Sequence, residues 1–193
     1  MGADSDVPRE GVVSQHVLLA IDPGLRGCGA ALFSDGLLVA AAYVPSTHTE
    51  DAMARACRET AQAVQEWCCK VDMLHLPNAL VLEWPTTYGG RASRGDARDL
   101  LSLAGVDGAI AAFFPGARVD CVEPHAWKGS VTKPKRAADP YPIEARARER
   151  LSAEESARVE WPGSAKHRWD VADGVALGLY HLGRFERRRI IHR

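Results

Sequence analysis

The sequence predicts an α/β fold in which helices flank a mixed β-sheet. Short apolar runs rich in branched residues, typical of buried strands, recur along the chain. From residue 50 onward they alternate with longer segments whose apolar residues recur at helical spacing. Such alternation favours a sheet covered by helices. The 193 residues, 46% hydrophobic and 25% charged, suit one globular domain.

The first elements are three predicted strands in a meander. Apolar runs occupy residues 16–22 (HVLLAID), 28–34 (CGAALFS) and 37–44 (LLVAAAYV), and Asp35-Gly36 separates the last two. An Asp-Gly pair between two apolar runs is a strong hairpin signal. We therefore expect three antiparallel strands.

Helices and strands then alternate along the chain. In order, they are a long amphipathic helix at 50–70, a strand at 78–84, a helix at 96–114 with Asp96 as its N-cap, and a strand at 117–124. A loop rich in helix breakers and basic residues follows at 129–142, then one or two charged helices at 143–159 and a last helix at 167–185.

We expect one domain at residues 16–183, between a flexible N-terminal tail (1–15) and a basic C-terminal tail (184–193). The net charge of −1 does not by itself indicate a nucleic-acid partner. Five cysteines, an odd number without a C-x-x-C pair, predict reduced thiols and a cytoplasmic protein. No apolar run approaches the roughly 18 residues of a membrane span, and the polar N-terminus is unlike a signal peptide.

Four acidic residues stand where α/β proteins often carry catalytic groups. Asp22 and Glu83 close the first and fourth predicted strands, and Asp170 and Asp173 share one face of the last helix. If they converge, their mutual repulsion calls for a divalent cation, and oxygen-only ligands favour Mg²⁺ or Mn²⁺. Two such ions about 4 Å apart can activate a water and stabilise a leaving oxygen in phosphoryl transfer.

Each acid also has a purely structural explanation. Asp22-Pro23-Gly24 is a common turn, and Glu83 could be an exposed strand end. The two helical aspartates could simply favour the helix N-terminus, if that helix begins near Trp169. The order and placement of all four acids together favour a site.

The segments LLAIDPGLRGCGAALF, LVLEW and HRWDVADGVALGLYH together resemble the RuvC family of Holliday-junction resolvases. The resemblance covers residues 16–182 and implies a ribonuclease H-like fold, with a five-stranded mixed sheet of three antiparallel strands and then two parallel ones. It implies a metal-dependent endonuclease that cleaves branched DNA by two-metal-ion hydrolysis. The implied ligands of two Mg²⁺ ions, for which Mn²⁺ substitutes, are Asp22, Glu83, Asp170 and Asp173. A homodimer is also implied, with the helix at 96–114 as a candidate interface.

The resemblance assigns roles to two loops. Lys128 matches the first of two lysines near the scissile phosphate, and Lys133 or Lys135 matches the second, although lysines are also common in solvated loops. In the loop after the fourth strand, an aromatic residue can stack on an unpaired base. Tyr88 is the candidate, because Trp84 directly follows the buried strand and is expected in the core.

Other polar residues are candidates for contact with substrate. Arg91 and Arg94 share the loop of Tyr88, and the C-terminal arginines either bind a phosphate backbone or keep the chain in solution. His167 supports the acids, acts as a general base, or is a surface residue at a helix start. Gly27 and Gly29 are expected to leave room for a phosphate backbone, or to serve ordinary hairpin geometry.

Three other functions stay open. An ATPase or kinase of the actin-like superfamily also uses an aspartate-glycine turn after its first strand, but it usually needs a second lobe. A non-catalytic module that binds branched nucleic acid would have no need of the complete acid set. A nuclease for structured RNA or DNA flaps would use the same chemistry on another substrate.

Overall fold

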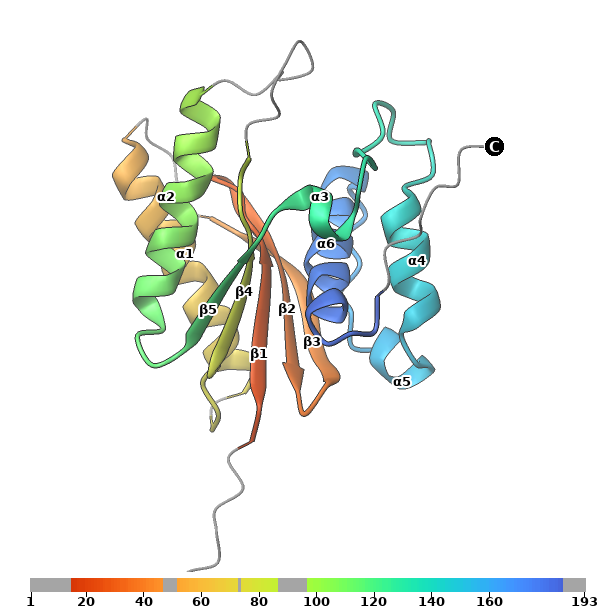
Figure 1. The fold of residues 1–193 in the computed structure, drawn as a ribbon, viewed down its shortest axis with the longest axis horizontal. Coiled ribbons are helices and arrows are strands. Elements are labelled where there is room, and N and C mark those ends of the chain that lie inside the picture. Colours follow the sequence, from red (N-terminus) through yellow and green to blue (C-terminus); the bar gives the residue numbers. More distant parts are fainter. Residues whose placement is uncertain (1–14, 47–51, 73, 87–96, 186–193) are drawn as a thin grey trace, which may run out of the picture.

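The computed structural model describes residues 15–46, 52–72, 74–86 and 97–185, which form a sheet between layers of helices (Figure 1). The sheet has five strands in the order β3-β2-β1-β4-β5. The first three strands pair antiparallel, and β4 and β5 run parallel to β1, which confirms the predicted mixed sheet. The strand bounds are β1 (Val17–Asp22), β2 (Gly27–Ser34), β3 (Leu37–Pro45), β4 (Ala79–Glu83) and β5 (Arg118–Val122).

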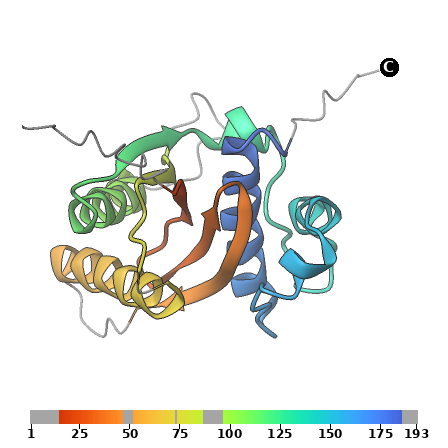
Figure 2. The ribbon, with the colours of Figure 1, turned by 90° about the horizontal axis from the view of Figure 1, so that it is seen from below.

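Helices cover both faces of the sheet (Figure 2). Two helices, α1 (Met53–Val71) and α2 (Ala97–Phe113), lie on one face. On the other face lies α6 (Ala165–His181), with α4 (Pro142–Arg150) and α5 (Ala153–Ser156) outside it. A single turn, α3 (Pro124–Trp127), follows β5. The predicted cap Asp96 lies outside the described residues.

Two separate hydrophobic layers follow from the alternation of side chains along the strands. On β1, Leu18 and Ala20 pack beneath α6, whereas Leu19 and Ile21 pack beneath α1 and α2. All six residues of β1 are buried, as expected for a central strand covered on both faces. Among the described residues, no helix is both long and apolar enough to cross a membrane.

The predicted hairpin between the second and third strands is confirmed. Asp35 and Gly36 connect β2 and β3, and their φ angles of 49° and 82° lie in the left-handed region. Glycine adopts this conformation without strain, and aspartate tolerates it better than most residues. The Asp-Gly pair therefore closes the hairpin between β2 and β3, whose register shifts once, between Leu32 and Phe33.

The packed structure extends beyond the predicted boundary at residue 183. Phe185 is 2% exposed and its ring meets the edge of Trp127. Arg184 pairs with Glu155, with 2.7 Å between the guanidinium Nη1 and the carboxylate Oε1. Arg184 and Phe185, predicted as the start of a basic tail, therefore pack against the domain.

Glycines allow α6 to lie directly on the backbone of β2. A Cβ atom at Gly29 would overlap the carbonyl oxygen of Asp170, and a Cβ atom at Gly174 would lie 2.7 Å from the carbonyl oxygen of Gly29. The expectation that Gly29 leaves room for a phosphate backbone is therefore wrong, because the space is filled by the helix. This contact sets the height of α6 above the sheet.

We predict that Gly29→Ala lowers the free energy of unfolding by about 1–3 kcal/mol, because the added methyl group forces α6 away from β2. Urea unfolding of the parent and the variant measures the change. Gly108→Ala is the control: this exposed helical glycine has nothing within 4 Å of an added Cβ. It should raise the stability by about 0.5–1 kcal/mol. A Gly29→Ala chain as stable as the parent would contradict the close packing.

Candidate active site

Two neighbouring strands each deliver a carboxylate to the same face of the sheet. β1 and β4 pair in parallel with Ile21 opposite Leu82, so the next residues, Asp22 and Glu83, lie side by side at the strand ends. Ala20 packs in the layer beneath α6, and Asp22 points the same way because side chains alternate with a period of two. Side chains alternate in the same way along β4, so Glu83 also points toward the layer beneath α6.

The last helix contributes the other two acids from its interior. Because α6 begins at Ala165, Asp170 and Asp173 lie beyond its first turn. The explanation that they only favour a helix N-terminus is therefore excluded. Asp22 pairs across the sheet with Gly29, the residue on which the backbone of Asp170 rests, so the docking of α6 brings strand and helix acids together.

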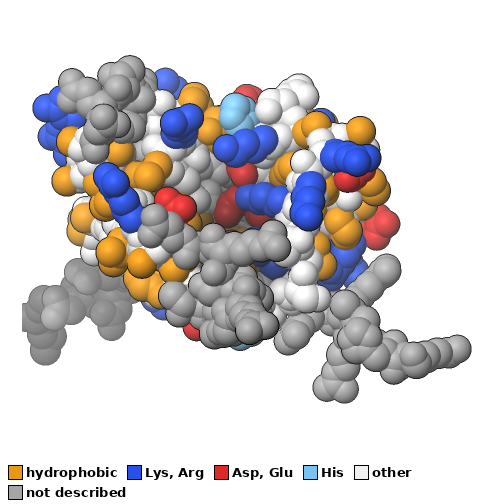
Figure 3. Space-filling model, turned by 90° about the horizontal axis from the view of Figure 1, so that it is seen from above, with side chains coloured by type: hydrophobic (Ala, Val, Ile, Leu, Met, Phe, Trp, Pro, Cys, Tyr) orange, Lys and Arg blue, Asp and Glu red, His pale blue; other side chains and the backbone are white. Residues whose placement is uncertain are grey.

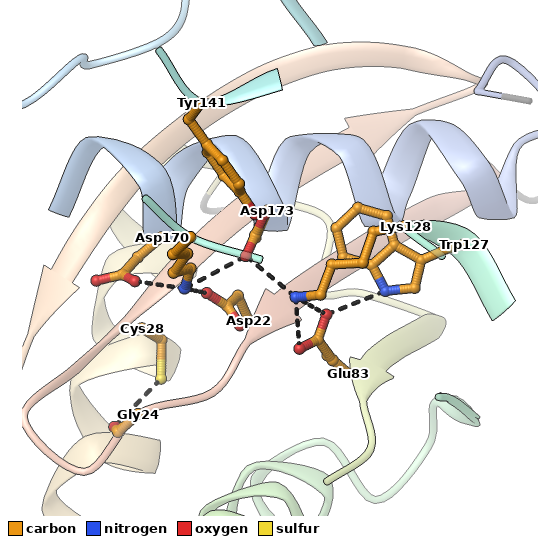
Figure 4. Close-up of polar contacts among 10 residues, drawn as sticks. Asp22, Gly24, Cys28, Glu83, Trp127, Lys128, Tyr141, Asp170 and Asp173 are labelled. Carbon is orange, nitrogen blue, oxygen red and sulfur yellow. Dashed lines mark hydrogen bonds and ion pairs between the residues drawn. The ribbon is translucent and has the colours of Figure 1, made fainter. Parts of the chain in front are cut away.

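Three of the four predicted acids form a close group. Oxygen atoms of Asp22, Glu83 and Asp173 all lie within 4.8 Å of one another. The side chain of Asp173 is fully buried, and Asp22 is 8% exposed. Asp170 is not part of this close group, but a lysine connects it to two members (Figure 4).

Lys133 lies among the carboxylates. Its Nζ is 2.8 Å from Asp22 Oδ2, 2.7 Å from Asp170 Oδ1 and 3.3 Å from Asp173 Oδ2. The ammonium donates hydrogen bonds to Asp22 and Asp170, and it forms an ion pair with Asp173. Of the two lysines predicted for the second phosphate contact, Lys133 is the one that meets the acids, whereas Lys135 is exposed.

Lys128 and Trp127 hold the other side of the cluster. The Nζ of Lys128 lies 2.8 Å from Glu83 Oε2 and 3.2 Å from Asp173 Oδ2. The indole Nε1 of Trp127 donates a hydrogen bond to Glu83 Oε2 at 3.0 Å. Trp127 is fully buried against Phe185, so the orientation of Glu83 is fixed by packing as well as by charge.

Tyr141 is a further partner that the sequence did not indicate. Its hydroxyl donates a hydrogen bond to Asp173 Oδ1, and the residue is 3% exposed. It immediately precedes α4, in a segment that was predicted only as a loop. Neither Tyr141 nor Trp127 carries a motif of its own, because only the path of the chain between β5 and α4 brings them to the acids.

Burial and paired charges shift the protonation of the site. Burial raises the pKa of Asp22 to about 7, although Lys133 opposes the shift. Burial also raises the pKa of Glu83, against the effect of Lys128. Burial alone would lower the pKa of both lysines, but the carboxylates around them raise it above its ordinary value. Both ammonium groups therefore stay charged at neutral pH.

Asp107 is an additional acid in the helical layer on the opposite face. It lies on α2, is 1% exposed, and neither carboxylate oxygen has a hydrogen-bond partner among the described residues. Burial raises the pKa of Asp107 to about 8, and the charges of Asp22 and Glu83 add to the shift. At pH 7 the carboxyl group is therefore mainly neutral. The only sequence feature that could have indicated Asp107 is its position as a single aspartate within an apolar stretch of the helix.

One aromatic candidate differs from its predicted position. Trp84, expected in the core, is 39% exposed, because β4 ends at Glu83 and the tryptophan lies past the strand end. His167 stacks on Tyr43, with ring centroids 3.9 Å apart. The substrate-binding residues predicted in the loop after β4 lie outside the described residues: Tyr88, Arg91 and Arg94.

The donor set fits a hard divalent cation. The close group offers only carboxylate oxygens, which suit Mg²⁺ and Mn²⁺ better than Zn²⁺. Figure 3 shows the face at this end of the molecule, where carboxylates lie in a hollow between lysine and arginine side chains. Positive charge beside the acids suits a polyanionic substrate, because it offsets the repulsion between the acids and phosphate groups.

Comparisons with known proteins identify the fold. No family model matches the chain, and no curated protein matches it. The structure of RuvC from Thermus thermophilus in complex with a Holliday junction substrate is 20% identical, with a TM-score of 0.54 over 86% of this chain and 92% of that chain. Thermus thermophilus RuvC alone is 18% identical, with a TM-score of 0.52 over 88% and 98%. The chain thus has the predicted ribonuclease H-like fold that these structures share.

Asp107→Asn should change how stability depends on pH. Because the pKa of Asp107 is raised from 3.8 to about 8, the folded parent keeps a proton that the unfolded chain releases between these values. Asp107 therefore costs the parent stability as pH rises through this window, and the asparagine variant lacks this contribution while keeping those of Asp22 and Glu83. We expect the advantage of the variant to grow from pH 5 to pH 8.5, reaching on the order of 3 kcal/mol.

Urea unfolding at pH 5, 7 and 8.5 measures this difference. Asp139→Asn, at an exposed loop position, is the control and should change the free energy of unfolding by less than about 0.5 kcal/mol at each pH. Parallel pH profiles for the parent and Asp107→Asn would contradict a buried carboxyl group that stays neutral at pH 7.

Proposed function

We propose that the chain is a metal-dependent endonuclease that cleaves phosphodiester bonds in branched DNA, with the four-way junction as its substrate. The observation that carries the proposal is the convergence of Asp22, Glu83 and Asp173, whose oxygen atoms lie within 4.8 Å of one another. One of the similar structures is a RuvC in complex with a Holliday junction substrate, which supports branched DNA as the substrate class.

Asp22, Glu83 and Asp173 would hold the divalent cations, and Asp170 would join them as a fourth ligand. We propose Mg²⁺, with Mn²⁺ as a substitute, because both prefer oxygen ligands. When bound, two such cations activate a water nucleophile and stabilise the leaving oxygen of a phosphodiester. These carboxylates come from β1, β4 and α6, so three separate elements would hold the cations.

The remaining side chains orient the ligands and offset the charge of the substrate. Trp127 and Tyr141 each donate a hydrogen bond to one ligand carboxylate, and such donors hold a carboxylate in one orientation. Lys128 and Lys133 supply positive charge beside the acids, where it would stabilise negative charge that develops on the phosphate. Lys135 and the arginines of the loop at 86–96 would hold more distant phosphates.

A homodimer would place two active sites on the two strands of a junction that must be cut symmetrically. We propose α2 as its interface, because this helix leaves the large apolar side chain of Leu101 67% exposed. A cytoplasmic location is proposed from the cysteines, all five of which are free thiols.

Asp22→Asn should keep binding a synthetic four-way junction but cleave it at least about a thousandfold more slowly, because a neutral amide would hold a divalent cation much less well than a carboxylate. Gel-shift binding and cleavage of a labelled junction in Mg²⁺ measure the two properties. Asp139→Asn is the matched control and should cleave at the parent rate. Cleavage by Asp22→Asn at the parent rate would contradict the mechanism.

Trp84→Ala should weaken binding to a junction more than binding to linear duplex. The indole is exposed one residue after Glu83, and stacking of a base on an aromatic ring contributes roughly 1–3 kcal/mol. Loss of that stacking corresponds to a weakening of about 5- to 150-fold. Fluorescence anisotropy measures both affinities, and Trp84→Phe should restore most of the junction affinity. Equal losses on junction and duplex would contradict stacking at the branch point.

Three other experimental results would each favour one of the alternative functions. Binding of ATP in calorimetry would favour an actin-like ATPase or kinase. Junction binding without Mg²⁺-dependent nicking would favour a non-catalytic module. Faster cleavage of flaps or structured RNA than of a four-way junction would keep the chemistry and change the substrate.

A further inference from the structure

We propose that Lys133 competes with the divalent cation for the acids, and that a DNA phosphate releases it, so that branched DNA and metal strengthen each other's binding. This inference rests on the proposed function. It adds a coupling between metal binding and DNA binding, which the acid cluster alone would not produce.

The contacts of Lys133 place its charge on groups that a cation would use. Its ammonium lies within 3.3 Å of Asp22, Asp170 and Asp173. Asp22 and Asp173 are also two of the three acids in the close group, so Lys133 contacts carboxylates that would bind the cation. A divalent cation bound there would meet a like charge at close range. The ammonium must therefore leave, and three ion pairs must break, before the cation binds fully.

Lys133 is placed where such a movement is possible. It lies in the stretch between α3 and α4 that has no helix or strand at this point, and its side chain is 34% exposed. Lys128 differs, because it directly follows the buried Trp127 and its side chain is 12% exposed. Of the two ammonium groups beside the acids, Lys133 thus has the more open path to solvent, and Lys128 is the fixed one.

A phosphate group offers the ammonium an alternative partner. Charge-assisted contacts from lysine to phosphate are strong, and DNA brings many phosphates to the same face. If a phosphate draws Lys133 away, the acids become available to the cation. Linkage then requires the reverse effect: a bound cation that expels Lys133 makes it available to DNA, by the same factor.

The first test measures Mn²⁺ binding to the DNA-free chain by electron paramagnetic resonance. We expect Lys133→Met to tighten Mn²⁺ binding at least tenfold, because the competitor is gone. Lys166→Met, which removes the same charge from an exposed position on α6, is the matched control and should change the affinity less than twofold. Equal Mn²⁺ affinities for the parent and Lys133→Met would overturn the inference.

A second test uses calorimetry with Ca²⁺, which binds similar oxygen ligands, in the presence and absence of a four-way junction that is checked on a gel to be uncut. The parent should bind Ca²⁺ at least tenfold more tightly with the junction, and Lys133→Met should lose most of this gain. An unchanged gain in the variant would show that the DNA supplies ligands directly, and would overturn the inference.

The unmodified side chain can also be observed directly, in case Lys133→Met folds poorly. The Cε signal of Lys133, followed by NMR in ¹³C-lysine-labelled parent protein, should move toward the position of solvated lysines as Ca²⁺ is added. A signal that stays in place at saturating Ca²⁺ would overturn the inference.

Asp22→Asn separates this inference from the proposed function. If Asp22→Asn abolishes Mn²⁺ binding while Lys133→Met leaves it unchanged, the metal site stands and only the competition fails. If Asp22→Asn has no effect on Mn²⁺ binding, the proposed metal site fails, and the competition fails with it.

Discussion

Electrostatic repulsion among carboxylates gathered at one end of the sheet is the constraint on which the rest of the structure depends. Asp22, Glu83 and Asp173 are mostly buried, and burial without compensation would cost several kcal/mol per charge. Lys128 and Lys133 compensate for the charge by pairing with these acids. The two ammonium groups offset only part of this charge, because the carboxylates of Asp22, Glu83, Asp170 and Asp173 outnumber them.

The fold creates this crowding through backbone contacts rather than through the acids themselves. Parallel pairing of β1 with β4 sets two strand ends side by side, and the missing Cβ atoms of Gly29 and Gly174 let α6 settle onto the sheet. Hydrophobic burial beneath α6 supplies the driving force for this docking. Packing energy from the core is thus used to hold like charges together, and a methyl group at the glycine contact would act on both stability and chemistry.

The sequence predicted the mixed sheet and the positions of Asp22 and Glu83 because strand periodicity and strand ends are local features. The partners Trp127 and Tyr141 could not be predicted, since they depend on the path of an irregular segment that local patterns do not specify. Trp84 was placed wrongly for a related reason: the burial of a residue at a strand end depends on where the covering layer stops. Periodicity thus located the acids, and only tertiary structure located their partners.

Cleavage of a synthetic four-way junction by the unaltered chain, in Mg²⁺ and in EDTA, tests the central claim most directly. Linear duplex, a flap and a structured RNA are included as parallel substrates. The account predicts nicks near the branch point of the junction in Mg²⁺ alone, at a rate well above that for the other three substrates. Cleavage that persists in EDTA, or binding to the junction without any cleavage in Mg²⁺, would contradict it.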